Sequence, residues 1–561
     1  MNFSYLTRHA CGCAGIAVLL SALFPFVAGC TGSSSTNAPS VVSTDAMENE
    51  PDGHELLDSA LQIFQLQNLG ISSDLERGVS LLNQWRRVQQ RLGVTFEPTP
   101  DEVQQLSSRV PAEWMPELKR SNYTVRDGEF LRDLLLARAL QEHAIGQADS
   151  ELARVLNIFG FVVRNIQLED EHPDQIPLST FETFLFGTGT AADRAWLFAD
   201  MLRQLKIDAV ILSTVEDAGK SGPLLVGVLS GSDVLLFDAQ AGIPLPGPMA
   251  TAANGIQRPA TLAEVREHPE LLRQLDIDAD KPYPLTADHI TNPSVQIIAS
   301  TSLWSDRMQG LQSAFIGDRS MVVCDPLIGA DGSFERVARF GKNLWTPEQV
   351  TVWKYPDEQL GGRQNPSVQQ RQTMQRLIDS WNAPLALQVV KGPPQQIRVT
   401  PTRTAYRARI AQVRGKYEDA VKSYLVVQID SKRILSAALD AGAPVEGQSR
   451  PKIDPRVVHM HEKAEDDARF WIGVCKFEQG GSNGVRVAAD KCRQYLEEHP
   501  QGDWRVSVRY LLANCLADQH EFAKAAEQLG EIPAENPQRF GYHWLAKSWK
   551  QAAGDATAAS K

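Results

Sequence analysis

The sequence predicts an α+β protein that is mainly helical, with a small antiparallel sheet in its first half and an α-helical repeat region at its C-terminal end. Apolar residues recur at helical spacing along most of the 561 residues. Residues 224–229 and 234–238 are short apolar runs joined by a tight Ser-Gly-Ser-Asp connection, which predicts a β-hairpin. The stretch 469–475 recurs in altered form at 509–515, which indicates stacked helix pairs.

The first 52 residues indicate export. Arg8 precedes an apolar run at residues 14–24, which is too short to span a membrane and is followed by small residues before Cys30. This pattern predicts a signal peptide over residues 1–29 and a flexible, Ser- and Thr-rich tether over residues 30–52. An internal hydrophobic helix followed by a linker is the alternative.

The Val-Ala-Gly-Cys sequence at residues 27–30 resembles the bacterial lipobox. The resemblance implies that Cys30 is acylated and that the mature protein is exported and lipid-anchored to a bacterial membrane, facing the periplasm or the cell surface. The formal net charge of −12 repels phosphate backbones, so nucleic acid is not an expected partner. Contact with the membrane is expected through the lipid anchor only, and the oligomeric state stays open.

Amphipathic helices are expected on both sides of the tight loop at residues 187–190. The pattern predicts an N-terminal helical region over residues 53–128 and a second unit over residues 129–250, which contains the hairpin. The expected helices are 54–69, 74–92, 128–144, 151–166 and 191–205, and residues 206–212 then turn into a strand.

The helix expected at residues 191–205 has a well-specified start. Thr190 stands three positions before Asp193, which is the spacing of a capping box, so both residues are expected to cap this helix. The unpaired amides of a helix N-terminus also lower the pKa of a thiol placed there, which is how some enzymes activate a cysteine. The first helical residue here is Ala191, and a methyl group cannot attack an acyl carbon.

Together with the helix before it and the hairpin after it, this loop resembles the transglutaminase-like superfamily over roughly residues 130–250. The resemblance implies a papain-like core in which a cysteine opens the helix, a histidine lies on the first hairpin strand and an aspartate ends the second. Here Ala191 stands at the cysteine position, residues 223–229 contain no histidine, and Asp238 alone matches. Asp238 also suits a simple turn role. Ala191 and Asp238 are therefore vestigial positions, and the chain is expected to be a pseudoenzyme more than an enzyme.

Relocated catalysis is the alternative. Thr190 and Cys324 are the weak candidate nucleophiles, and His172 or His268 would have to approach as a base. A capping role for Thr190 and a strand position for Cys324, within an extended segment 319–325, are the simpler expectations.

Residues 251–400 predict a mixed helical and extended region. Helices are expected at 261–275, 302–315 and 369–381, and Trp304, Trp345, Trp353 and Trp381 are expected to be packing residues. The chain contains no Gly-rich phosphate loop, no Cys-x-x-Cys pair and no His-Glu-x-x-His motif, so neither a cofactor nor a metal is predicted.

Residues 401–552 are expected to form the repeat array, followed by a disordered tail at 553–561. Residues 405–424 resemble a tetratricopeptide repeat, which implies a surface for protein or peptide ligands. A helical cap that only stabilises the rest is the alternative. Cys475 and Cys515 occupy equivalent places in two repeats and are expected to be buried.

His459, His461 and Glu462 lie just before the expected repeats and could suggest a metal site. The two histidines face different sides of a helix, so a solvated helix start is expected in place of a metal site. The pairing of Cys324, Cys475, Cys492 and Cys515 as disulfides stays open.

Three functions remain open at this point. The first is a non-catalytic, membrane-anchored lipoprotein with a scaffold or interaction role in the cell envelope. The second is an active cysteine- or threonine-type hydrolase or acyltransferase with a relocated nucleophile. The third is a module that binds peptidoglycan peptides in the cleft left by the missing active site.

Overall fold

The computed structural model describes residues 53–68, 74–170, 172, 175–215, 221–248, 258–341, 343–363, 365–390, 396–442 and 454–559. It is a mainly helical α+β fold, as predicted. The expected signal peptide, Cys30 and the tether lie outside the described residues. Among the helices that are described, none combines the length and the apolar character needed to cross a membrane.

The N-terminal helices pack on α5 (Val125–Ala144), with Phe64 at their centre. Phe64 is fully buried, and a Cβ added at Gly78 or Gly128 would come within 2.6 or 3.2 Å of its ring. The two glycines therefore allow the first two helices and α5 to approach closely. The elements of this region are α1 (Gly53–Phe64), α2 (Leu75–Arg91), α3 (Pro100–Ser107), η2 (Ala112–Trp114) and α4 (Met115–Leu118).

A six-stranded sheet lies at the centre of the fold and is larger than predicted. Its order is β6-β5-β4-β3-β7-β8, and neighbours are antiparallel except for the parallel pair β7 and β8. The predicted hairpin is β4 and β5, with Leu225 opposite Asp238 and Ser230 opposite Asp233. The bounds are β3 (Ala209–Val215), β4 (Ser221–Ser230), β5 (Asp233–Asp238), β6 (Ile243–Pro244), β7 (Ser294–Ile297) and β8 (Val350–Val352). The last two strands were not predicted because they are only four and three residues long.

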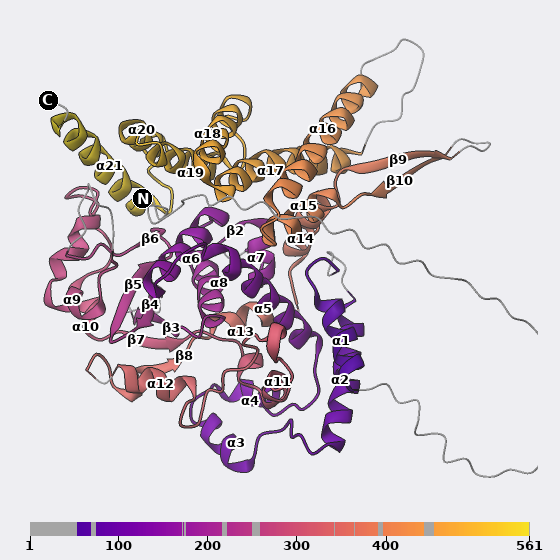
Figure 1. Cartoon of the computed structure of the whole chain (residues 1–561), viewed down its shortest axis with the longest axis vertical. Helices are drawn as coiled ribbons and strands as arrows, with labels where there is room; N and C mark the ends of the chain where they lie inside the picture. Colours follow the sequence, from indigo (N-terminus) through magenta and orange to yellow (C-terminus); the bar gives the residue numbers. More distant parts are fainter. Residues whose placement is uncertain are drawn as a thin grey trace, which may run out of the picture.

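Four helices pack beside this sheet and hold the segment that resembles an active-site loop (Figure 1). They are α5, α6 (Glu151–Asn165), α7 (Thr180–Phe186) and α8 (Ala191–Arg203). Phe159 on α6, Phe198 on α8 and Phe237 on β5 form one aromatic cluster, with ring centroids 5.0–5.4 Å apart. A short parallel pair, β1 (Gln167–Leu168) and β2 (Thr188–Gly189), fixes the loop just before α8.

The segment at residues 319–325 is not a strand, contrary to the prediction. Its residues 321–326 run without regular structure, and glutamine side chains take the place of a neighbouring strand. Gln204 exchanges two hydrogen bonds with the backbone of Val322, and Gln312 bonds the backbone of Met321, Val323 and Cys324. The segment therefore needs no neighbouring strand, because the side-chain amides of Gln204 and Gln312 supply hydrogen-bond partners to its backbone.

The other elements between residues 258 and 401 are mostly short helices. Trp304, Trp345, Trp353 and Trp381 are all buried, as expected of packing residues. The bounds are α9 (Leu262–Glu267), η3 (Pro269–Leu275), α10 (Ala287–Thr291), η4 (Thr301–Trp304), α11 (Asp306–Gln312), η5 (Gly317–Arg319), α12 (Ser333–Phe340), η6 (Pro347–Gln349), α13 (Tyr355–Gly362), α14 (Val368–Trp381), β9 (Leu385–Val390) and β10 (Gln396–Pro401).

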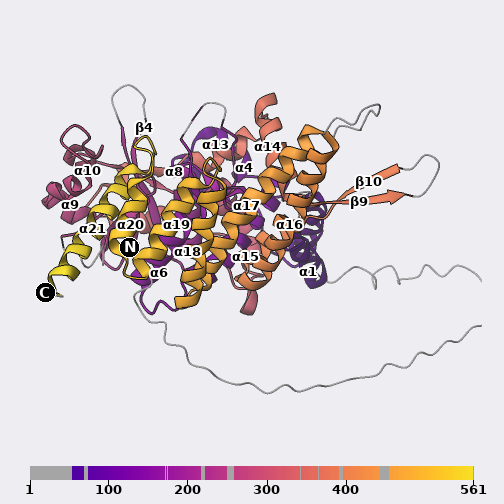
Figure 2. The same ribbon diagram turned by 90° about the horizontal axis from the view of Figure 1, so that it is seen from above.

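Seven helices follow and stack in chain order, each against the next. They are α15 (Thr404–Val413), α16 (Tyr417–Gly442), α17 (Pro455–Gln479), α18 (Gly481–Glu498), α19 (Arg505–Asp518), α20 (Phe522–Gly530) and α21 (Arg539–Ala559). Cys475 and Cys515 are fully buried within the stack, as predicted. The tail expected from residue 553 is helical as far as Ala559. Figures 1 and 2 show this array lying across the α5–α8 side of the core.

Candidate functional site

The start of α8 is a capping box, as predicted. The Thr190 hydroxyl accepts from the backbone N–H of Asp193 at 3.1 Å, and the Asp193 carboxylate accepts from the backbone N–H of Thr190 at 2.9 Å. The same carboxylate oxygen accepts from the Thr190 hydroxyl at 2.9 Å. Both residues are buried. The hydroxyl proton of Thr190 therefore points to a carboxylate that already serves the cap.

Tyr355, at the start of α13, completes a ring of hydrogen bonds over this helix end. Its hydroxyl donates to the second oxygen of Asp193 at 2.9 Å and lies 3.1 Å from the Thr190 hydroxyl. Its ring stacks on Trp353, with centroids 5.0 Å apart, and meets Trp196 edge-on. The Tyr355 side chain therefore packs at the N-terminal end of α8 and bonds to both capping residues.

The structure places Ala191 at a helix start and Asp238 at a strand end. Ala191 is the first residue of α8 and is half-buried. Asp238 ends β5, where one carboxylate oxygen accepts from the backbone N–H of Gln240 and Ala241 at 2.8 and 2.7 Å. The other oxygen accepts from the Tyr283 hydroxyl at 2.5 Å. Asp238 therefore holds a turn and a tyrosine, and burial raises its pKa.

The candidate bases are also elsewhere. His172 is exposed, and His268 lies at the exposed C-terminal end of α9, with its Nδ1 atom 3.1 Å from a carboxylate oxygen of Glu270. Neither histidine is among the donors that meet Asp238.

Cys324 is a buried thiol. Burial raises its pKa above the ordinary value, and the nearby carboxylates Asp325 and Asp306 raise it further. A nucleophilic cysteine needs the opposite, since the thiolate is the reactive form. Like Cys324, the cysteines at 475, 492 and 515 are free and buried.

Arg194, the residue after the capping aspartate, makes contacts that the sequence did not reveal. Its buried guanidinium donates to the carbonyl oxygens of Ile166 and Ala239 and to the side-chain oxygen of Gln538 at 2.9 Å. Burial lowers its pKa to about 10. Because Gln538 directly precedes α21, this arginine joins the α8 terminus to the repeat array.

Two tryptophans of the array close on the same loop. A Cβ at Gly187, whose φ is +73°, would come within 2.5 Å of Trp471 and 3.1 Å of Trp504. The guanidinium of Arg409 lies 3.5 Å from the ring centre of Trp471 and 4.3 Å from that of Phe184, a cation–π arrangement. This face of the array is therefore buried against the core and is not open to a ligand.

The histidine pair before the repeats is split between the interior and the surface. His461 is buried, contrary to the expected solvated start: its Nδ1 lies 2.8 Å from the Val457 carbonyl, and its Nε2 accepts from the Leu385 N–H at 3.3 Å. His459 is exposed and lines a cleft of about 550 Å³ between α14 and the start of α17, beside Gln372, Gln375, Arg376, Pro455 and Arg456. No cluster of metal-ligand side chains occurs in the described part of the chain.

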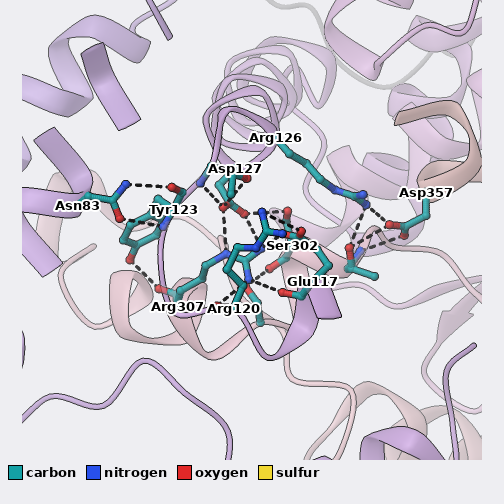
Figure 3. A network of polar contacts seen from close by, with 12 residues as sticks. Asn83, Glu117, Arg120, Tyr123, Arg126, Asp127, Ser302, Arg307 and Asp357 are labelled. Atoms are coloured by element: carbon teal, nitrogen blue, oxygen red, sulfur yellow. Dashed lines mark hydrogen bonds and ion pairs between the residues drawn. The ribbon is translucent and has the colours of Figure 1, made fainter. Parts of the chain in front are cut away.

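A second cluster of charged groups lies at the start of α5 (Figure 3). The fully buried Arg307 donates twice to Asp127 at 2.9 Å and once each to the carbonyl oxygens of Glu117 and Arg120. Ser302 donates to Asp127 at 3.0 Å. This cluster joins segments about 180 positions apart, and Arg307 and Asp127 are both fully buried, so we assign it to stability.

The neighbouring pair extends this cluster toward α13. Arg126 forms an ion pair with Asp357, whose carboxylate also accepts from the backbone N–H and the hydroxyl of Thr301 at 3.0 and 2.9 Å. No local sequence pattern could have indicated these partners, because they are far apart along the chain.

Comparisons of the chain with protein-family models, with curated proteins and with solved structures find no match.

Proposed function

We infer that this chain is an exported, lipid-anchored bacterial protein in which a transglutaminase-like core without catalytic activity supports a helical array that binds protein or peptide partners. One observation carries this proposal. At the helix end where that family places its nucleophile, the side chains of Thr190, Asp193 and Tyr355 are hydrogen-bonded to one another, and the Tyr355 ring stacks on Trp353.

The chemistry of acyl transfer supports the non-catalytic part. Such a site needs a nucleophile, a base that takes its proton and a group that orients the base. Ala191 has no proton to lose, and the hydroxyl of Thr190 donates to the carboxylate of its own cap. Asp238, which would orient the base, accepts from Tyr283. Cys324 is buried and held as the neutral thiol.

The covered helix end also bears on peptide binding in the remnant cleft. A peptide placed there would have to displace Tyr355 from Trp353 and from two hydrogen bonds. The outer surfaces of the array and the cleft beside His459 are better candidates, because they are exposed. Arg376 and His459 line the cleft beside Arg456, which already pairs with Asp379, so a carboxylate-bearing peptide would bind chiefly through Arg376.

Turnover measurements test the non-catalytic part. The purified full chain and its Ala191→Cys variant are assayed against peptide amides, glutamine side-chain amides and peptide esters. We expect neither to exceed the uncatalysed rate, although the new thiol should react with iodoacetamide. Turnover by the unmodified chain that disappears in Thr190→Val or in Cys324→Ser would overturn the proposal.

Two measurements in the native envelope test the anchor and the binding part. Cys30→Ala should move the protein from the membrane fraction to the soluble fraction, and unchanged membrane association would contradict a lipid anchor. Proximity labelling with the full chain should mark a defined set of envelope proteins. Deleting residues 402–561 is a poor control, because it would strip Trp471, Trp504 and Gln538 from the core. Point variants such as Arg376→Glu are better suited.

A further inference from the structure

The outer side of α16 carries a cluster of exposed apolar side chains. Leu425, Val426 and Ile429 are 37%, 46% and 63% exposed. Of the large hydrophobic residues that are exposed in the described chain, these three alone lie within one short stretch; the others, Leu92, Val125, Ile316 and Val368, are scattered. Scattered exposed residues need no explanation, whereas a cluster indicates an interaction surface.

The fold itself does not use this side of the helix. The buried residues of α16 are Ala420, Val421, Tyr424, Val427 and Ser431. Each residue of an α-helix is rotated by about 100° from the one before it. With this rotation, most of the buried side chains lie on the side of α16 opposite to Leu425, Val426 and Ile429. α15 and α17 are the elements that contact α16 most extensively, and the three apolar side chains stay exposed beside them in the described structure. Figures 1 and 2 show α16 at one end of the array, where a second molecule could reach it.

Charged residues flank the cluster at both ends. Glu418, Asp419 and Lys422 lie on its N-terminal side, and Asp430, Lys432 and Arg433 lie on its C-terminal side, so the outermost charges are negative at one end and positive at the other. Glu418 and Arg433 are equally far from the midpoint between Leu425 and Val426, and so are Asp419 and Lys432.

The present ion pairs of these residues are loose. Lys422 lies 3.8 Å from Asp419, Arg433 3.5 Å from Asp430, and Lys432 3.8 Å from Glu465. Lys432 also lies 3.7 Å from Glu498, and the side chain of Glu465 is buried. The three cations are 73%, 77% and 54% exposed, and pairs made by such exposed cations contribute little stability. They can therefore be exchanged for contacts with another molecule at little cost.

We propose that two copies of this chain associate through antiparallel packing of α16 about a two-fold axis between Leu425 and Val426. This symmetry places the apolar clusters against each other. It also places Glu418 and Asp419 of one copy opposite Arg433 and Lys432 of the second copy. A parallel arrangement would instead set like charges side by side, so the charge pattern selects the antiparallel dimer.

The contact is short. Residues 418–433 span about 24 Å of helix, so the buried area is below the roughly 800 Å² per partner of a stable interface. The dimer is therefore weak in solution. Confinement of both copies to one membrane by the lipid anchor proposed above would raise their effective concentration and favour the dimer. This membrane effect rests on the proposed anchor, whereas the contact between the two α16 helices does not.

Disulfide cross-linking of the full chain in membranes tests the geometry. The native cysteines described here are buried and do not interfere. Val426→Cys places a thiol near the axis and should give an intermolecular disulfide on mild oxidation. Ser436→Cys, exposed further along the helix, is the matched control and should not cross-link to itself. Equal cross-linking of both variants would overturn the antiparallel arrangement.

Sedimentation velocity of the full chain in detergent tests the association. The dimer fraction should rise with protein concentration, and Val426→Asp should weaken dimerisation ~10-fold or more while leaving the unfolding temperature unchanged. Arg433→Glu should weaken it, and adding Glu418→Arg to that variant should restore it. A chain that stays monomeric at every concentration, or a Val426→Cys product that contains only a different envelope protein, would overturn the proposal.

Discussion

Two helices of this protein begin with the same local motif and use it differently. Helix α5 starts with Thr124 and Asp127, and α8 starts with Thr190 and Asp193, each a threonine three positions before an aspartate. In both, one carboxylate oxygen accepts from the backbone N–H of the threonine, at 2.8 Å in α5 and 2.9 Å in α8. The helix starts are therefore equivalent at the level of local structure.

The difference lies in what reaches the carboxylate from a distant part of the chain. Asp127 receives the buried guanidinium of Arg307, whereas Asp193 receives the neutral hydroxyl of Tyr355. The first contact is a buried ion pair between distant segments, and its loss leaves Arg307 with Glu117 as its remaining carboxylate partner. The second is a neutral cover. The two helix starts share a cap motif, so the distant partner of each aspartate determines the role of that helix start. Asp127 forms a buried ion pair, and Asp193 accepts from a neutral hydroxyl.

Removing the two aspartates separately gives the largest expected effect. Asp127→Ala loses a cap and leaves Arg307 with Glu117 as its remaining carboxylate partner, so we expect a loss of about 3–5 kcal/mol in the free energy of unfolding. Asp193→Ala loses a cap and a hydroxyl contact, which should cost about 1–2 kcal/mol. Urea unfolding monitored by tryptophan fluorescence measures both. Equal losses would show that Arg307 adds nothing to the α5 cap.

The contrast between local and distant partners also explains what the sequence could predict. The Thr190 and Asp193 cap and the hairpin that ends in Asp238 follow from residues a few positions apart, and the structure confirms both. Tyr355 and Gln538 contact α8 from more than 150 positions away, and no periodicity points to them.

Short or irregular elements were missed for a related reason. Strands β7 and β8 are too short to show alternation, and the segment around Cys324 looks like a strand although Gln312 supplies its backbone partner. The burial of His461 likewise depends on Leu385, which belongs to another region. Local pattern therefore predicted the start of α8 and the hairpin, whereas the contacts of Tyr355 and Gln538 with α8 needed the three-dimensional fold.

Asp133, a second buried carboxylate of α5, should make the free energy of unfolding depend on pH. Burial raises the pKa of Asp133 to about 7, and the adjacent Arg132 only partly opposes this. Between the unfolded pKa of about 4 and the folded value, the folded state holds one more proton than the unfolded state. Stability should therefore fall as pH rises through this window, by about 1.4 kcal/mol per pH unit at most.

The variant Asp133→Asn removes this titration and keeps an oxygen that can accept from Arg132 and Ser179. Relative to the variant, the unmodified protein should lose about 2–3 kcal/mol between pH 5 and pH 7. Urea midpoints measured across this range test it, and groups common to both proteins cancel in the difference. Parallel pH profiles would show that Asp133 stays ionised in the folded state.

The smallest expected effect comes from the two tyrosine hydroxyls that close the two helix starts. Tyr355→Phe removes the donor to Asp193 but keeps the ring on Trp353, so we expect a loss of about 1 kcal/mol. Tyr123→Phe is the matched change at α5, where the hydroxyl donates to the Arg307 carbonyl at 2.7 Å, and should cost a similar amount.

The functional consequence separates these two tyrosine variants. In Tyr355→Phe the ring stays on Trp353 and the Thr190 hydroxyl still donates to Asp193, so loss of the tyrosine hydroxyl supplies no base and no turnover should appear in amide and ester assays. Hydrolysis gained by Tyr355→Phe and not by Tyr123→Phe would mean that the Tyr355 hydroxyl inhibits a catalytically competent Thr190. In that case the core would be an inhibited enzyme and not a non-catalytic support.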